Sequence, residues 1–305
     1  MSVIMGLTTK WPLVIVNSKF QLLCAMELLH KLGAKDCLIF TTMENFDSTI
    51  FSKIFNINLR EFRIRNIPKL DRELVIIGND RSFTFETLKA ANIFKLIYAV
   101  DDGSSDVLQK KHQTPFKRKW YQKICIFALK KISNKYSDSV KFTFNTSGSN
   151  NIINDFSYVK NLLSNDPDNS SKKSYFIGQP LTELDLTELS IEVDYIKTSI
   201  KNYDLDYYLV HPKDSKEKVN HLQSNGIKCY FGESFETELL LSRIKPSLIV
   251  TISSTVAISY ILLTKNRNRI IIIDPPLLKK KSMFKDEFIE TCTAVYEFIN
   301  QRNNE

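Results

Sequence analysis

The sequence is poor in glycine and lacks the common motifs for nucleotides and metals. Eight glycines occur in 305 residues. None forms a G-x-G-x-x-G segment after an expected strand, which disfavours a dinucleotide oxidoreductase, and no P-loop is present. The cysteines lack CxxC or metal-ligand spacing, which favours free thiols in a reducing compartment. They are Cys24, Cys37, Cys125, Cys229 and Cys292.

Long apolar runs and a signal peptide are absent too. No run reaches the roughly 18 apolar residues of a membrane span. The opening "MSVIMGLTTKWPLVIVNSKF" does not have the order of charged and apolar regions of a signal peptide. We therefore expect a cytoplasmic protein. With 43% hydrophobic and 25% charged residues the composition is that of a soluble globular protein, and the length favours two domains.

Positive charge is abundant and concentrated. The formal net charge is +8, and residues 109–135 contain many lysines and no acid. Apolar side chains are interleaved with these cations: Phe116, Trp120, Ile124, Phe127 and Leu129. The second half of the segment has enough helical character to form one apolar stripe. The stripe could face the protein core, or the segment could bind an anionic lipid surface or a phosphate backbone. No nucleic-acid motif accompanies the charge, so we expect no nucleic-acid partner.

Both halves of the chain alternate short apolar runs with segments of helical period. Apolar strands that alternate with amphipathic helices indicate a parallel sheet covered on both faces. A polar, Asn- and Ser-rich stretch at 162–174 is typical of a linker. We predict an α/β protein with two Rossmann-like doubly wound domains, residues 1–165 and 166–285, and a closing helix over 286–305.

Polar residues follow the expected strands. "YAVDDGSSD" places Asp101, Asp102 and Gly103 after one strand, where they fit an ordinary turn. "YYLVHPKD" places His211 and Pro212 after another. A lone histidine there is often structural, but ligands of open α/β sheets bind at such strand ends.

The third polar segment, "SLIVTISSTVAISYILL", puts Ser253 and Ser254 between a strand and a helix start. Serines in this place either cap the helix or bind a phosphate together with the helix N-terminus. Glu236 and Glu238 fall in the first turn of another expected helix, where the helix dipole favours carboxylates. A glutamate there could equally accept hydrogen bonds from ribose hydroxyls.

Together these segments resemble the bacterial sialyltransferases, which carry (D/E)(D/E)G, HP and S/SS segments in this order. The likeness is strongest to the lipooligosaccharide and capsule sialyltransferases of glycosyltransferase family 52, relatives of the polysialyltransferases. "VNSKFQLLCAMELL" and "YFIGQPL" are similar to that group as well. The basic stretch has no counterpart in the resemblance.

The resemblance implies a GT-B architecture, in which two Rossmann-like domains face a cleft, and inversion at the anomeric carbon without a metal or cofactor. Asp101 beside Asp102 would be the general base, and Gly103 would form the turn. His211 would also be catalytic, as the partner of the departing phosphate. The donor CMP-sialic acid would be bound by residues of the second domain: Gly178, Gln179, His211, Pro212, Glu236, Ser253 and Ser254. Ser18 and Gln21 are candidates on the acceptor side.

The sequence thus predicts an enzyme that transfers sialic acid to a galactose or sialic acid hydroxyl of a bacterial surface glycan: lipooligosaccharide, O-antigen or capsule. A lipid-linked acceptor would fit a protein held at the inner face of the inner membrane through residues 109–135. Two alternatives stay open. One is a GT-B enzyme that uses another nucleotide sugar, and the other is a nonenzymatic basic protein that binds membranes or nucleic acid.

Overall fold

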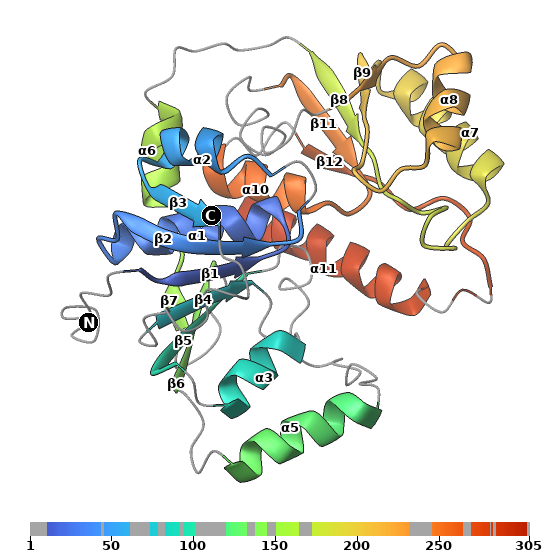
Figure 1. The fold of residues 1–305 in the computed structure, drawn as a ribbon. Helices are drawn as coiled ribbons and strands as arrows, with labels where there is room; N and C mark the ends of the chain where they lie inside the picture. Colours follow the sequence, from blue (N-terminus) through green and yellow to red (C-terminus); the bar gives the residue numbers. More distant parts are fainter. Residues whose placement is uncertain are drawn as a thin grey trace. The chain divides into compact units, whose positions relative to one another are not determined.

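A computed structural model describes most of the chain (Figure 1). The described residues are 11–43, 46–61, 74–78, 83–91, 94–101, 120–132, 138–144, 151–164, 173–231, 246–264, 270–280, 282 and 285–303. They divide into two compact units: unit 1 extends to Val159 and unit 2 begins at Lys160. Each unit has its own parallel sheet.

The sheet of unit 1 has the order β3-β2-β1-β4-β5-β6-β7, and every neighbouring pair is parallel. Its strands are β1 (Leu13–Val16), β2 (Asp36–Thr41), β3 (Asn58–Glu61), β4 (Leu74–Gly78), β5 (Leu96–Val100), β6 (Asp138–Thr143) and β7 (Asn151–Ile153). The strand order reverses between β1 and β4. A reversal of this kind opens a crevice at the carboxyl ends of the two strands.

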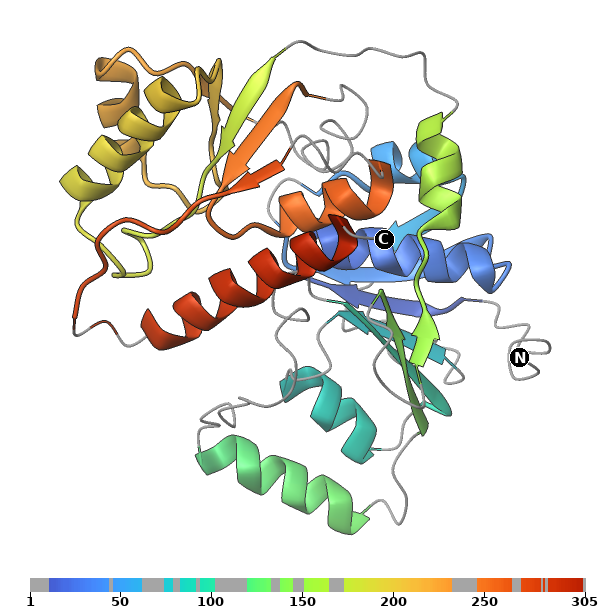
Figure 2. The same cartoon turned by 180° about the vertical axis from the view of Figure 1, so that it is seen from behind.

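Helices cover both faces of this sheet. They are α1 (Lys19–Lys31), α2 (Ser48–Phe55), α3 (Phe83–Ala91), α5 (Trp120–Ile132) and α6, which begins at the end of unit 1 (Ser157–Ser164). Phe85 of α3 joins the core formed by Leu13, Val75 and Ile97 of the strands. Figures 1 and 2 show α1 on the opposite face, and α5 lies beside α3, with which it is in contact.

A buried glutamate ties the first helix of unit 1 to the last. The carboxylate of Glu27 on α1 has no exposed surface. It accepts hydrogen bonds from the Ser157 hydroxyl (3.1 Å) and from the N–H groups of Tyr158 (3.1 Å) and Val159 (3.0 Å). These donors belong to the first turn of α6, where N–H groups have no partner within the helix. Glu27 therefore supplies the cap of a helix far away in sequence.

Unit 2 has a smaller sheet of order β10-β9-β8-β11-β12, again parallel throughout. Its strands are β8 (Ser174–Ile177), β9 (Tyr207–Leu209), β10 (Cys229–Tyr230), β11 (Leu248–Thr251) and β12 (Ile270–Ile272), and its helices are α7 (Leu189–Asn202), α8 (Lys216–Ser224), α10 (Thr255–Thr264) and α11 (Lys285–Asn303). The order reverses between β8 and β11.

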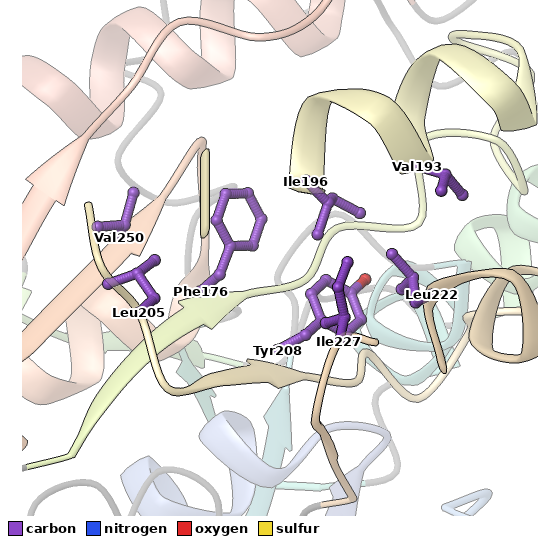
Figure 3. Close-up of a cluster of buried hydrophobic side chains, with 8 residues drawn as sticks. All are labelled: Phe176, Val193, Ile196, Leu205, Tyr208, Leu222, Ile227 and Val250. Carbon is purple, nitrogen blue, oxygen red and sulfur yellow. The ribbon is translucent and has the colours of Figure 1, made fainter. Parts of the chain in front are cut away.

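Helices α7 and α8 pack on this sheet through a tight apolar core. Figure 3 shows its members, Phe176, Val193, Ile196, Leu205, Tyr208, Leu222, Ile227 and Val250. Strand residues and helix residues interdigitate here, which fixes the carboxyl ends of β8 and β9 relative to α7 and α8. Helix α10 is apolar all round and is buried from Ala257 to Leu263.

The predicted fold class, α/β with two Rossmann-like doubly wound units, is confirmed. The predicted closing helix is α11. The predicted linker overlaps the end of α6 and the first residue of β8, and residues 165–172 between them lie outside the described part. That the two units face each other across a cleft stays a prediction.

Replacing Glu27 tests the link between α1 and α6. Glu27→Ala leaves the buried N–H of Val159 and the half-buried N–H of Tyr158 without their acceptor, so we expect the free energy of unfolding to fall by about 2 kcal/mol or more. Denaturant unfolding monitored by circular dichroism measures this. Glu290→Ala, at an exposed position of α11, is the control and should change stability little. Equal stability of the two variants would show that the cap contributes nothing.

Candidate functional site

The candidate donor residues of unit 2 follow three neighbouring strands. Gly178 comes directly after β8, His211 comes two residues after β9, and Ser253 comes two residues after β11. Because β9, β8 and β11 are adjacent and parallel, these strand ends lie at one edge of the sheet, with about 4.8 Å between neighbouring strands. The edge includes the reversal between β8 and β11, where ligands of doubly wound sheets bind.

The HP segment forms a closed turn. The N–H of Asp214 donates to the carbonyl oxygen of His211 (2.9 Å), with Pro212 in the second position of the turn, which its fixed φ suits. The Asp214 carboxylate folds back and accepts the N–H of His211 at 2.8 Å. Both the backbone and the side chain of Asp214 thus hold His211 in place.

The same turn also determines which tautomer the His211 imidazole adopts. The N–H of Lys213 donates to Nδ1 of His211 at 3.1 Å, so Nδ1 is an acceptor. Burial lowers the pKa of His211 to about 4; Asp214 opposes this shift, whereas Lys218 and Lys213 add to it. At neutral pH the ring is therefore uncharged, with its proton on Nε2. It can donate one hydrogen bond through Nε2–H.

A buried ammonium group organises the surroundings of this turn. Nζ of Lys218, on α8, donates to the carboxylate of Asp214 (2.7 Å), to the carboxylate of Glu192 on α7 and to the carbonyl oxygen of Gln179 (2.7 Å). The Lys218 side chain has no exposed surface, and the carboxylates of Glu192 and Asp214 are buried with it. Lys218 therefore joins α7, the HP turn and the segment that follows β8.

Two further carboxylate contacts complete this network. Glu183 lies 3.8 Å from the Lys218 ammonium and accepts the N–H of Ser215 at 2.7 Å. Burial raises the pKa of Glu183, but the Ser215 hydrogen bond and Lys218 outweigh it, so the net pKa is lowered. Glu192 accepts the N–H of Thr182 at 2.9 Å. The carboxylates thus bind loop backbone and ammonium at once.

Gly178 is required by a close approach of two strands. A Cβ atom at this position would lie 2.4 Å from the hydroxyl oxygen of Tyr208 and 2.8 Å from the carbonyl oxygen of Leu209. The Tyr208 hydroxyl in turn donates to Asp214 at 2.7 Å. Burial, with Asp214 nearby, raises the pKa of Tyr208 well above its usual value, so the phenol keeps its proton.

The serine pair caps helix α10. Ser253 and Ser254 are 5% and 6% exposed. The hydroxyl oxygen of Ser254 accepts the N–H of Val256 at 3.1 Å, which is the capping role expected of a serine here. A hydroxyl that accepts in this way can still donate its proton to a ligand. Burial raises the pKa of Cys292 to about 12, and a hydrogen bond with Ser253 partly opposes that shift.

The candidate site residues of unit 1, Asp101, Ser18 and Gln21, lie at the carboxyl ends of the strands of its own sheet. Asp101 directly follows β5 and is fully buried, and its Oδ2 accepts the N–H of Phe144 at 2.7 Å. Ser18 caps α1 by accepting the N–H of Gln21 at 3.2 Å. The Gln21 side chain lies against Gly78 at the end of β4, where a Cβ atom would be 2.2 Å from it. Ser18 and Gln21 thus lie at the reversal between β1 and β4.

Some predicted residues cannot be placed, and others were missed. Asp102, Gly103, Glu236 and Glu238 lie outside the described residues. The network of Lys218, Glu192 and Asp214 was not anticipated, because Asp214 lies in the turn before α8 and Glu192 on α7, so no helix-face spacing links them to Lys218. In the described part of the chain, no group of three or more His, Cys, Asp or Glu residues could hold a metal ion.

Two parallel, doubly wound units with polar residues at their strand ends have the architecture of α/β proteins that bind ligands at such strand ends. Comparison with known families makes the class definite. The family model described as Glycosyltransferase family 52 matches residues 26–277. The chain belongs to this family, as its motifs predicted, and it is a glycosyltransferase.

Other comparisons add little detail. A search of curated proteins found no match. The similar solved structures include the E. coli heptosyltransferase WaaC with ADP-2-deoxy-2-fluoro heptose, which has a TM-score of 0.41 and 11% sequence identity, with 95% of this chain and 99% of that chain covered. None of the helices that the structure describes is long and apolar enough to cross a membrane.

The Lys218 network can be tested through stability. Lys218→Met removes the charge that two buried carboxylates share, and we expect a loss of roughly 3 to 5 kcal/mol in the free energy of unfolding. Adding Glu192→Gln to this variant should recover part of the loss, because it removes one unpaired charge. Lys216→Met, at an exposed position of the same helix, is the control. A Lys218→Met protein as stable as the control would refute the role of the network.

The lowered pKa of His211 predicts acid sensitivity. The pKa of about 4 in the folded protein lies below the ordinary 6.5, so between these values the unfolded chain binds a proton that the folded protein does not. Stability should therefore fall as the pH drops from about 6.5 to about 4, by roughly 1 to 3 kcal/mol from this residue. His211→Gln should flatten the curve of unfolding free energy against pH in this range.

Nuclear magnetic resonance checks the cause directly. The chain has four histidines, so selective labelling gives few signals, and the one lost in His211→Gln belongs to His211. Titration of that signal near pH 6.5 in the folded protein would contradict the burial argument.

Proposed function

We propose that this glycosyltransferase moves sialic acid from CMP-sialic acid to a terminal hydroxyl of a bacterial surface glycan. Membership of the family implies a nucleotide-sugar donor and an oligosaccharide acceptor. The acceptor sugar in this proposal is galactose or sialic acid of a lipooligosaccharide, an O-antigen or a capsule. The identity of the donor rests on the HP and SS motifs, which follow β9 and β11, the two strands on either side of β8 in the sheet of unit 2.

The observation that carries the donor proposal is the state of His211. Its ring is neutral, Nδ1 accepts from Lys213, and the remaining Nε2–H is a single donor held by the HP turn. A donor fixed in advance stabilises the charge that develops on a leaving phosphate, because it does not need to reorganise during the reaction. Ser253, Ser254 and the N-terminus of α10 supply further donors for the same phosphate.

Asp101 is the base in this proposal. One of its carboxylate oxygens is fixed by the N–H of Phe144, directly after β6. A carboxylate held in this way has a defined orientation, and general base catalysis contributes about 10² to 10⁴ in rate. The same hydrogen bond also serves the structure, since it ties the end of β5 to the end of β6. A test must therefore separate catalysis from folding.

The proposed step is a single displacement. The acceptor hydroxyl oxygen attacks the anomeric carbon of sialic acid while the bond from that carbon to the phosphate oxygen of CMP breaks. The hydroxyl proton passes to Asp101, and the bonding electrons leave with the phosphate, which His211 and the serines stabilise. The products are the inverted glycoside and CMP. We propose that no metal takes part, because a single phosphate can be neutralised by such donors.

The first test is an assay of Asp101→Asn. The amide oxygen can still accept the Phe144 N–H, but an amide does not serve as a base. We expect transfer from CMP-sialic acid to fall by about 10²-fold or more, while the affinity for CMP in calorimetry stays unchanged. The assay measures CMP release with EDTA present, with lactose or sialylated lactose as acceptor.

Asp194→Asn, at an exposed position of α7, is the matched control and should keep full activity. Full activity of Asp101→Asn would exclude this aspartate as the base. If the wild type neither binds CMP nor releases it, the donor is wrong, and transfer from other nucleotide sugars becomes the measurement.

A further inference from the structure

Strand β11, helix α10 and strand β12 follow one another in unit 2 and form a strand–helix–strand unit (Figure 1). The two strands are parallel neighbours. Strand β11 adjoins the reversal of strand order, and β12 lies on its outer side. Dinucleotide-binding sheets use such a unit for one nucleotide. The phosphate lies at the helix N-terminus, and an acidic residue about 20 positions further on binds a ribose hydroxyl.

Asp274 occupies the place of that acidic residue. It stands 20 residues after Ser254 and two residues after β12. The N–H of Ile273 donates to the carbonyl oxygen of Thr251 at 2.9 Å, so the pairing of the two strands ends directly before Asp274. Ser253 likewise comes two residues after β11. Asp274 and Ser253 therefore stand at equivalent positions of two neighbouring strand ends.

A thiol of α11 links these two strand ends. Cys292 forms a hydrogen bond with Ser253. Its pKa is raised to about 12, mainly by burial and further by the charge of Asp274. Cys292 and Ile273 also pack against the same apolar cluster, which contains Ile252. The Ser253 hydroxyl and the Asp274 carboxylate are therefore close to one side chain, on the same part of the sheet edge.

The backbone of Asp274 is held in place. Its carbonyl oxygen accepts the hydroxyl of Tyr195 on α7. Two prolines follow in the sequence, and their rings fix φ. The carbonyl oxygen of Leu277 then accepts the hydroxyl of Thr187 at 2.8 Å. A residue that is fixed in this way loses little conformational freedom when a ligand binds.

The carboxylate of Asp274 is available to a ligand. Asp274 is exposed, and none of the residues that the structure describes forms a hydrogen bond or an ion pair with its carboxylate. A carboxylate accepts hydrogen bonds through both oxygens. It repels a phosphate, whereas two neighbouring hydroxyl groups can donate to its two oxygens at once.

From this placement we infer that Asp274 binds the ribose hydroxyls of the donor nucleotide. The inference rests on the proposed function, in which Ser253, Ser254 and the N-terminus of α10 bind the donor phosphate. The ribose of that nucleotide then extends toward the end of β12, and its hydroxyls donate to the carboxylate. Glu236, the candidate for the ribose contact from the sequence, lies outside the described residues, and the test includes it.

The transferred sugar also carries hydroxyl groups, but it fits Asp274 less well. The spacing of 20 residues from Ser254 and the position on the outer neighbour of the reversal strand are those of a ribose-binding acid. A nucleotide without the transferred sugar therefore separates the two ligands.

Calorimetry with two nucleotides tests the inference. CMP carries both ribose hydroxyls, and 2′,3′-dideoxy-CMP carries neither. We expect the wild type to bind CMP about tenfold or more tightly than the dideoxy form, because hydrogen bonds to a charged group are strong. Asp274→Ala should bind the two nucleotides alike. Asp194→Ala, at an exposed position of α7, is the matched control and should keep the preference for CMP. Circular dichroism checks that both variants fold.

Three results would overturn the inference. The first is an Asp274→Ala protein that keeps the full preference for CMP. The second is a preference that is lost in Glu236→Gln and kept in Asp274→Ala. The third is an Asp274→Ala protein with unchanged affinity for CMP but weaker binding of intact CMP-sialic acid, which would assign the carboxylate to the transferred sugar.

Failure of the proposed donor gives a different result. A wild type that does not bind CMP refutes that donor, and the same comparison is then made with UMP, AMP and GMP and their 2′,3′-dideoxy forms. Loss of the preference for the ribose form in Asp274→Ala would still support the inference. A wild type without any such preference would overturn it.

Discussion

The arrangement of the strand ends and turns around His211 in unit 2 depends on one buried ammonium group, that of Lys218. Removing the Lys218 charge from water is costly, and the cost is offset because Glu192 and Asp214 lie against it with their own hydrogen bonds satisfied. The three residues come from α7, the HP turn and α8, and the bond to Gln179 adds the segment after β8. The Lys218 contacts therefore fix the positions of α7, α8 and the HP turn relative to one another. Because Asp214 of this network also binds the N–H of His211, the network positions His211 as well.

Both sheets are parallel, and strands alternate with helices along the chain in each unit. This regular alternation made much of the fold predictable. Strands such as 74–78 and 96–100 are apolar throughout because they are buried on both faces, and the helices between them have a clear period. Parallel strands then send their carboxyl ends to one edge. His211, Ser253, Gly178 and Asp101 could be predicted as strand-end residues for this reason, before any contact between side chains was known.

The rest could not be predicted because it depends on contacts between distant segments. Lys218 stands in "KEKVNHLQS", where a lysine fits a solvated helix start, and Glu27 stands in a helix without any sign that α6 needs a cap. The apolar period of α5 fits a core and a surface equally well, since a period fixes a face but not what covers it. Local sequence patterns therefore predicted which polar residues follow the strands. The side chains that position these residues, such as Lys218, could be identified only from the tertiary packing.

The cysteines divide sharply in reactivity. Burial raises the pKa of both Cys37 and Cys292 to about 12, so these thiols stay protonated and unreactive at neutral pH. Cys24 is buried as well, Cys229 is partly buried with a raised pKa, and Cys125 is the exposed one of the five. Cys125 lies on α5, next in sequence to exposed Ile124 and two residues before exposed Phe127. A thiol-reactive spin label or fluorophore would accordingly attach at this helix in the unaltered chain, next to the surface whose surroundings it would report.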